Sequence, residues 1–196
     1  MVEKFLSLSS TKLQRQAFRK VSKLPIDEDT KAASIEWLKY IIFERQLSDN
    51  SLIAYTTDIS VFYKFLSKHL GLGRNITLTD LEALKAVDFR SFFANRLNPQ
   101  RDSEQKFADE KSTLARKKAS LRHYFRFLKK KMKVKNDIIR SLRTLPVKPP
   151  LPKPISTQEV KRIIDLAATL SNKVWLQKRD VAVLTLLYGC GLRIDE

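Results

Sequence analysis

The pattern in SLIAYTTDISVFYKFLSKHLGLG, residues 51–73, is that of an amphipathic α-helix. Its apolar side chains recur at intervals of three and four residues, which places them on one helical face. These residues are Leu52, Tyr55, Ile59, Phe62 and Leu66. The polar run SDNS at 48–51 predicts a turn ending in a helix cap, and GLG at 71–73 predicts the end of the helix.

Helical periodicity continues on both sides of this stretch. A helix is predicted from Ala32, with Ile35, Leu38 and Ile42 on its apolar face. Residues 77–97 predict a short helical turn and then a helix capped at Asp88, with Phe89, Phe92, Phe93 and Leu97 pointing inward. Hydrophobic residues make up 43% of the 196, with only 4 Gly, so the chain can bury a core. The sequence predicts an all-α fold.

A basic helix is predicted at 111–133. Its apolar stripe consists of Leu114, Leu121, Phe125, Leu128 and Met132. Between Lys111 and Lys153 there are 15 Lys and Arg but one acid, Asp137, so this segment supplies most of the net charge of +17. Lys and Arg bind phosphates with release of counterions, so the excess favours a nucleic-acid partner. The alternative is a solvated cationic surface.

The segment LPVKPPLPKP, residues 145–154, contains five of the seven prolines and predicts an extended connector. It divides the chain into a loosely attached N-terminal extension (1–30), a helical domain (31–145), a linker (146–154) and the start of a second domain (155–196). Ser156 and Glu159 form a predicted capping box. That box would start one helix, and the next helix, 178–188, is apolar on nearly all sides. Because about forty residues cannot cover such a helix, we expect the second domain to be incomplete.

Several classes of function are disfavoured. The single cysteine, Cys190, allows no disulfide within the chain. His69 and His123 lack metal-ligand spacing, and we expect neither a metal nor a cofactor. The apolar run 181–192 is shorter than the roughly 20 residues that span a bilayer. We therefore expect a cytoplasmic protein with no membrane association.

The segment GCGLRIDE, residues 189–196, places Arg193 just after a glycine turn and Glu196 three residues later. Arginine stays charged and can bind phosphate through two hydrogen bonds. The alternative is a surface arginine paired with Glu196.

Five segments, in this order, resemble the tyrosine recombinase (phage-integrase) family, and within it the chromosome-dimer recombinases of the XerC and XerD kind. They are LSDNSLIAYTTDISVFYKFL, ITLTDLEALKAVDFRSFFANR, STLARKKASLRHYFRFL, LPKPISTQEVKRII and RDVAVLTLLYGCGLRIDE. The resemblance covers residues 32–196. It implies a SAM-like helical core-binding domain that grips a DNA duplex, followed by the first helices of an incomplete catalytic domain.

The resemblance also implies a chemistry. In this family a tyrosine attacks the scissile phosphate to give a 3′-phosphotyrosine link, with neither metal nor nucleotide. Arg193 would be the first catalytic arginine and Glu196 a residue that supports it. The family's lysine, second arginine, histidines and tyrosine nucleophile would lie beyond Glu196. Tyr55, Tyr124 and Tyr188 sit on apolar helical faces, so none is expected to be a nucleophile. This C-terminally truncated chain is expected to bind DNA without cleaving it.

The expected partner is double-stranded DNA, and the full-length protein is expected to form a homo- or heterotetramer with a related recombinase. The candidate DNA-binding residues are Ser51, Arg116, Lys117, Lys118, Arg122, Arg126, Lys129 and Lys130. The function implied is site-specific recombination, in chromosome dimer resolution or integration. One alternative is a non-catalytic helical module that binds DNA or RNA. A basic protein that docks on acidic partners or anionic membranes is disfavoured, because the apolar stripes are committed to a core.

Overall fold

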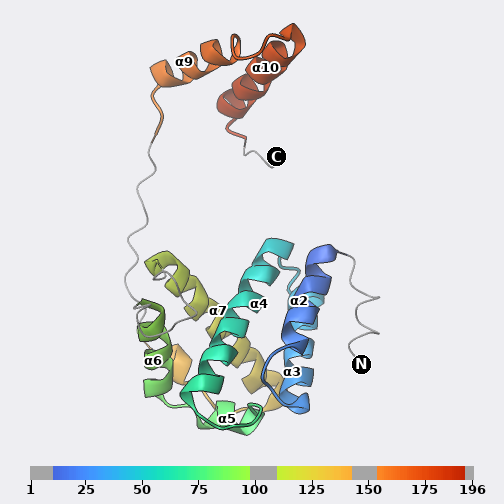
Figure 1. Cartoon of the computed structure of the whole chain (residues 1–196), viewed down its shortest axis with the longest axis vertical. Helices are drawn as coiled ribbons and strands as arrows, with labels where there is room; N and C mark the ends of the chain where they lie inside the picture. The colour runs from blue at the N-terminus through green and yellow to red at the C-terminus, as the bar shows by residue number, and fades with distance from the viewer. Residues whose placement is uncertain (1–10, 98–109, 143–153, 193–196) are drawn as a thin grey trace. The chain divides into compact units, whose positions relative to one another are not determined.

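The computed structural model describes residues 11–97, 110–142 and 154–192. The chain forms two compact units, Met1–Val147 and Lys148–Glu196. The helices of the first unit (Figure 1) are α2 (Lys12–Ser22), α3 (Glu28–Lys39), the π-helix η1 (Tyr40–Glu44), α4 (Asp49–His69), α5 (Leu78–Ala83), α6 (Ala86–Leu97), α7 (Lys111–Met132) and α8 (Ile138–Ser141). Those of the second are α9 (Thr157–Ala167) and α10 (Val174–Cys190). The all-α prediction is confirmed; a single bridge, Ile26 to Ile76, is the one β interaction among the described residues.

Helix α4 lies in the middle of the first unit and packs against α2, α6 and α7. Its predicted apolar residues Leu52, Ile59, Phe62 and Leu66 are all at most 1% exposed. Ser48 caps the helix by accepting a hydrogen bond from the backbone N–H of Ser51 at 3.3 Å. After the helix ends, Gly71 has φ +57°, a conformation that glycine adopts without strain.

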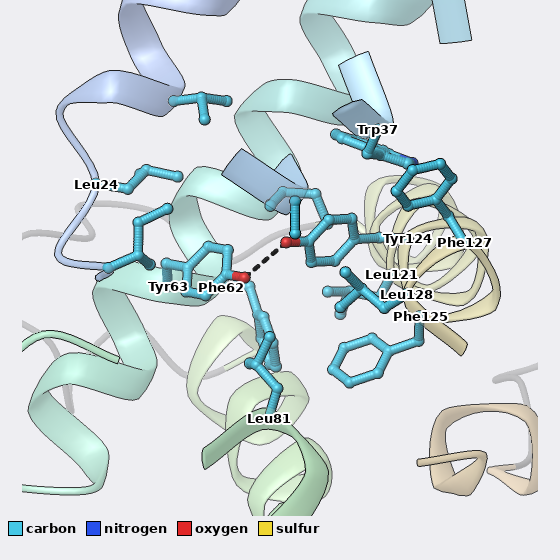
Figure 2. Close-up of a cluster of buried hydrophobic side chains, with 14 of the residues drawn as sticks. Leu24, Trp37, Phe62, Tyr63, Leu81, Leu121, Tyr124, Phe125, Phe127 and Leu128 are labelled. Carbon is cyan, nitrogen blue, oxygen red and sulfur yellow. Dashed lines mark hydrogen bonds between the residues drawn. The ribbon is translucent and has the colours of Figure 1, made fainter. Parts of the chain in front are cut away.

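The core joins α3, α4 and α7 through buried hydroxyl groups. Figure 2 shows Tyr63 and Tyr124 meeting in this core, with their hydroxyl oxygens 2.7 Å apart. The Tyr124 hydroxyl also lies 2.7 Å from the hydroxyl of Ser34 on α3. Burial raises the pKa of Tyr124 to about 12. These tyrosines therefore serve the packing of the unit, which agrees with the expectation that Tyr124 is no nucleophile.

The N-terminal region differs from the sequence-based expectation. We expected residues 1–30 to be loosely attached, but α2 packs against α3 and α4. Its residues Ala17, Phe18 and Val21 are at most 3% exposed. Only three of the eleven residues of this helix are buried and most of the others are polar or charged, so its composition resembles that of a surface segment.

Two details of α6 also differ. Asp88 lies in the first turn rather than at the cap, and its carboxylate accepts a hydrogen bond from the backbone N–H of Lys85 at 2.7 Å. Leu97, predicted to point inward, is 42% exposed, whereas Phe89 and Phe92 are fully buried.

The second unit consists of α9 and α10 packed on each other. The predicted capping box is confirmed, since Ser156 and Glu159 exchange hydrogen bonds at the start of α9. The sequence predicted that about forty residues cannot cover this apolar helix, and none of the residues of α10 is buried within the described chain. Tyr188, for example, is 52% exposed.

Candidate nucleic-acid interface

The N-terminal turn of α4 presents groups that suit a phosphate. The Ser48 hydroxyl donates to the hydroxyl of Ser51 at 3.0 Å, so both hydroxyls lie in the first turn. Backbone N–H groups and the positive end of the helix dipole point in the same direction. Ser51, a predicted DNA-binding residue, therefore lies at the positive end of the helix dipole, in the same turn as the carboxylate of Asp49.

Arg116 of α7 reaches across to this part of α4. Its Nη1 donates to the backbone oxygen of Ala54 at 3.3 Å and to Oδ2 of Asp58 at 2.6 Å. The side chain remains 41% exposed. Because Nε and Nη2 make no hydrogen bond within the described residues, they stay available to a ligand on the surface. The structure thus brings Arg116 to Ala54 and Asp58, three and seven residues after Ser51 on α4.

Asp58 is the residue that sequence reasoning missed. Its side chain is 1% exposed, and Oδ2 accepts a hydrogen bond from Ser120 at 2.7 Å as well as one from Arg116. Burial raises the pKa of the Asp58 carboxyl, while the hydrogen bond from Ser120 and the charge of Arg116 oppose the rise. Asp58 precedes the buried Ile59 in an apolar helix, and an acid at such a position predicts a cationic partner from a neighbouring helix.

Two of the predicted DNA-binding lysines lie on the inner side of α7. Lys117 is 6% exposed and Lys118 is 5% exposed. The Lys118 ammonium donates to the backbone oxygen of Leu142, and burial, with the nearby charge of Arg122, lowers its pKa. The expectation that both belong to an open cationic face was wrong. They fall between Leu114 and Leu121 in the three-and-four spacing of the buried stripe, which is why the fold covers them.

Arg122 is also occupied within the fold. Its guanidinium donates to the backbone oxygens of Ile139, Arg140 and Leu142 at 3.1–3.3 Å. Lys118 and Arg122 therefore converge on Leu142 and secure α8 against α7. The cationic side chains of the predicted set that remain exposed are Arg116, Arg126, Lys129 and Lys130.

The exposed cations of α7 differ in their surroundings. Lys129 forms an ion pair with Asp137, and both side chains remain about half exposed. Arg126 and Lys130 make no hydrogen bond or ion pair within the described part of the chain. Within the candidate set, Arg126 and Lys130 are therefore the α7 cations with the least structural function.

The candidate catalytic residues Arg193 and Glu196 lie outside the described residues. Helix α10, which leads to them, ends at Cys190, and Gly191 follows with φ +64°. No cluster of His, Cys, Asp and Glu suited to a metal ion occurs among residues 11–97, 110–142 and 154–192. Within those same ranges, every helix is too short or too polar to cross a membrane.

Comparisons with known proteins agree with these features. Residues 35–132 match the phage integrase N-terminal SAM-like domain. The chain is 38% identical over 173 residues to the tyrosine recombinase XerC of Brucella suis biovar 1, an alignment that covers 88% of this chain and 52% of the relative. It is 35% identical over 173 residues to the XerC of Mesorhizobium japonicum, with the same coverage, and 28% identical to that of Rickettsia bellii, with 87% and 53% covered.

The chain spans about half the length of the curated relatives it matches. No solved structure matches it. The domain match begins within α3, includes α4, α5 and α6, and ends with the last residue of α7, so it contains the elements that carry Ser51, Asp58 and Arg116. The chain therefore belongs to the phage integrase family through its N-terminal SAM-like domain, and it is similar to curated tyrosine recombinases of the XerC kind.

Proposed function

We propose that the first unit binds duplex DNA as the core-binding domain of a site-specific recombinase. The observation that carries this proposal is the arrangement in the first half of α4, where Ser48 caps the helix beside Ser51 and Asp58 holds Arg116, whose side chain remains 41% exposed. Phosphate contacts of this kind position a protein on DNA without reading its sequence. Family membership supplies the reaction class.

The proposed reaction of the whole recombinase is strand cleavage and rejoining through a 3′-phosphotyrosine intermediate, in chromosome dimer resolution or integration. Arg193 would stabilise the charge that develops on the scissile phosphate, since a fixed cation at that position lowers the barrier to phosphoryl transfer. Glu196 would support Arg193. We place this protein in the cytoplasm, acting on duplex DNA as a homo- or heterotetramer with a related recombinase.

The binding proposal predicts a steep dependence on salt. Each phosphate that a cation neutralises lowers the slope of log Kobs against log salt by about 0.9, so the four exposed cations of the candidate set predict a slope of about −4 or steeper. Fluorescence anisotropy of a labelled 30-base-pair duplex between 50 and 200 mM salt measures this slope. The variant R126A/K130A should reduce the slope by about two. A slope near zero for the unmodified chain would refute DNA binding through phosphates.

We further propose that the 196-residue polypeptide binds DNA without cleaving it. Tyr63 and Tyr124 are fully buried, and Tyr40 and Tyr55 pack against the ring of His123. Incubation with a nicked duplex followed by denaturing electrophoresis should therefore reveal no covalent protein–DNA complex. Tyr188 is the exposed tyrosine, so a covalent complex that disappears in Y188F would show that the prediction is wrong.

A further inference from the structure

Helix α2 carries a row of cations along its exposed face. Lys12, Arg15, Arg19 and Lys23 are all exposed, and the chain has no acidic residue between Thr11 and Leu24. The opposite face is fixed in the core through Ala17, Phe18 and Val21. The row therefore has a defined direction relative to the rest of the unit, unlike the cations of a mobile tail.

These cations have little function within the fold. In the parts of the chain that the structure describes, no hydrogen bond or ion pair engages the guanidinium of Arg15 or Arg19. On α7, by contrast, Arg122 binds three backbone oxygens, and Lys118 shares one of them, that of Leu142. The positive charge on α2 stays at the surface, where it repels other cations and attracts an anionic partner.

Two cations, one from α2 and one from α7, approach the same turn of α4 from different sides. Lys20 of α2 donates to the hydroxyl of Thr57 at 2.9 Å. Arg116 of α7 donates to the backbone oxygen of Ala54, three residues earlier on α4. Gln14 donates to Asp49 at 3.4 Å, so α2 and α4 run in the same direction and their N-terminal ends lie together (Figure 1). Helix α2 thus flanks the candidate interface directly.

We infer that α2 is a second phosphate-binding helix, which extends the duplex interface beyond the phage integrase domain. That domain matches from residue 35, so α2 lies outside it. The inference rests on the proposed function, because it assigns α2 to the same DNA duplex. From Lys12 to Lys23 the helix rises about 16 Å, at 1.5 Å per residue. This length corresponds to about five base-pair steps of 3.4 Å, so several of its cations can contact neighbouring phosphates.

The burial of Phe18 disfavours a lipid partner. A membrane-binding amphipathic helix inserts its apolar face into the bilayer, whereas the apolar face of α2 is already packed, with Phe18 3% exposed. The exposed row contains charged and polar side chains only, which suits a phosphodiester backbone. Because such contacts read no bases, α2 should strengthen binding to every duplex sequence equally.

The test compares two charge-matched double variants of the full chain. R15A/R19A removes two cations from α2. K85A/K135A removes two exposed cations near the other end of α4. Asp88 binds both the backbone N–H of Lys85 and the ring of His69, and Asn136, which follows Lys135, donates to the backbone oxygen of Leu84. With a random-sequence 30-base-pair duplex, R15A/R19A should reduce the magnitude of the salt slope by about two, while K85A/K135A should leave it unchanged. The variant R15K/R19K should retain the slope of the unmodified chain.

The possible outcomes separate the two proposals. If the unmodified chain binds with a steep slope and R15A/R19A keeps that slope, the α2 inference fails and DNA binding stands. A flat slope for the unmodified chain refutes both. Equal losses in the two double variants would indicate a general charge effect and would also overturn the inference. A lipid partner would overturn it too. That outcome would be flotation of the unmodified chain, but not of R15A/R19A, with phosphatidylglycerol vesicles at a salt concentration that abolishes duplex binding. An unchanged circular dichroism spectrum confirms that the variants are folded.

Discussion

Helices α2 and α7 are both rich in cations, but they use them differently. In α7, Lys117 and Lys118 are buried, and Arg122 is bonded to α8. In α2, Lys12, Arg15 and Arg19 are exposed, and Lys20 alone of the helix's cations is half-buried, bonded to Thr57 of α4. The difference follows from position. Helix α7 contacts α3, α4 and α8, so few of its faces remain open, whereas α2 contacts α3 and α4. The number of cations in a segment is therefore a poor measure of the charge that it offers to a ligand.

This comparison changes how mutations on α7 should be interpreted. A variant such as R116A/K117A/R122A removes structural contacts together with candidate phosphate contacts. Loss of DNA binding by that variant would not distinguish an unfolded protein from a damaged interface. Variants at Arg126 and Lys130, or at Arg15 and Arg19, remove charge with much less effect on packing.

The largest effect that we predict is on stability, for R116A. The substitution leaves the carboxylate of Asp58, which is 1% exposed, without its cationic partner. Because Arg116 is itself 41% exposed and Asp58 keeps the hydrogen bond from Ser120, the loss should be about 2 kcal/mol, below the cost for a fully buried pair. The matched control R126A, on the same helix, should change stability by less than about 0.5 kcal/mol, as is usual for surface substitutions.

Urea unfolding can report this effect for the first unit alone. Trp37 is fully buried in the first unit, whereas Trp175 lies on α10. Fluorescence of Trp37 in a W175F background therefore follows the unfolding of the unit that contains Asp58. Equal stabilities of R116A and R126A would contradict the distinction between structural and exposed cations on α7.

The sequence predicted the strongly periodic elements well. Helices α4 and α7 were found close to their observed positions because their apolar residues recur without interruption. The capping box at Ser156 was found for the same local reason, since its two residues lie one turn apart. Such features depend on neighbours along the chain, which the sequence displays directly.

Other features depend on contacts between distant segments. The widening of α3 into the π-helix Tyr40–Glu44 has no sequence signal that we recognise. The attachment of α2 depends on three buried residues among many polar ones. For Lys117 and Lys118 a signal existed, because they continue the spacing of the buried stripe, but their charge favoured the opposite interpretation. Only the arrangement of α8 and Leu142 shows what the Lys118 ammonium binds.

A smaller effect is predicted for the pH dependence of the stability of R116A. This dependence tests whether the stability lost in R116A comes from the charge of Arg116 or from its packing. Burial raises the pKa of Asp58 in the folded protein above its ordinary value of 3.8. The folded state therefore retains the proton to higher pH than the unfolded state does, so this group contributes stability at acid pH that is lost as pH rises through the folded pKa.

Removing Arg116 raises that pKa further, because the ionised carboxylate loses an opposite charge. The deficit of R116A relative to the unmodified protein should then be smaller at pH 3.5 than at pH 7, because protonation of Asp58 removes the charge that Arg116 neutralises. Urea unfolding at the two pH values measures the change. In a D58N background the effect of R116A should not vary with pH, since the titrating group is gone. A deficit of the same size at both pH values would instead assign the loss to the packing of the Arg116 side chain on α4. The charge of Asp58 would then make no contribution to the position of Arg116.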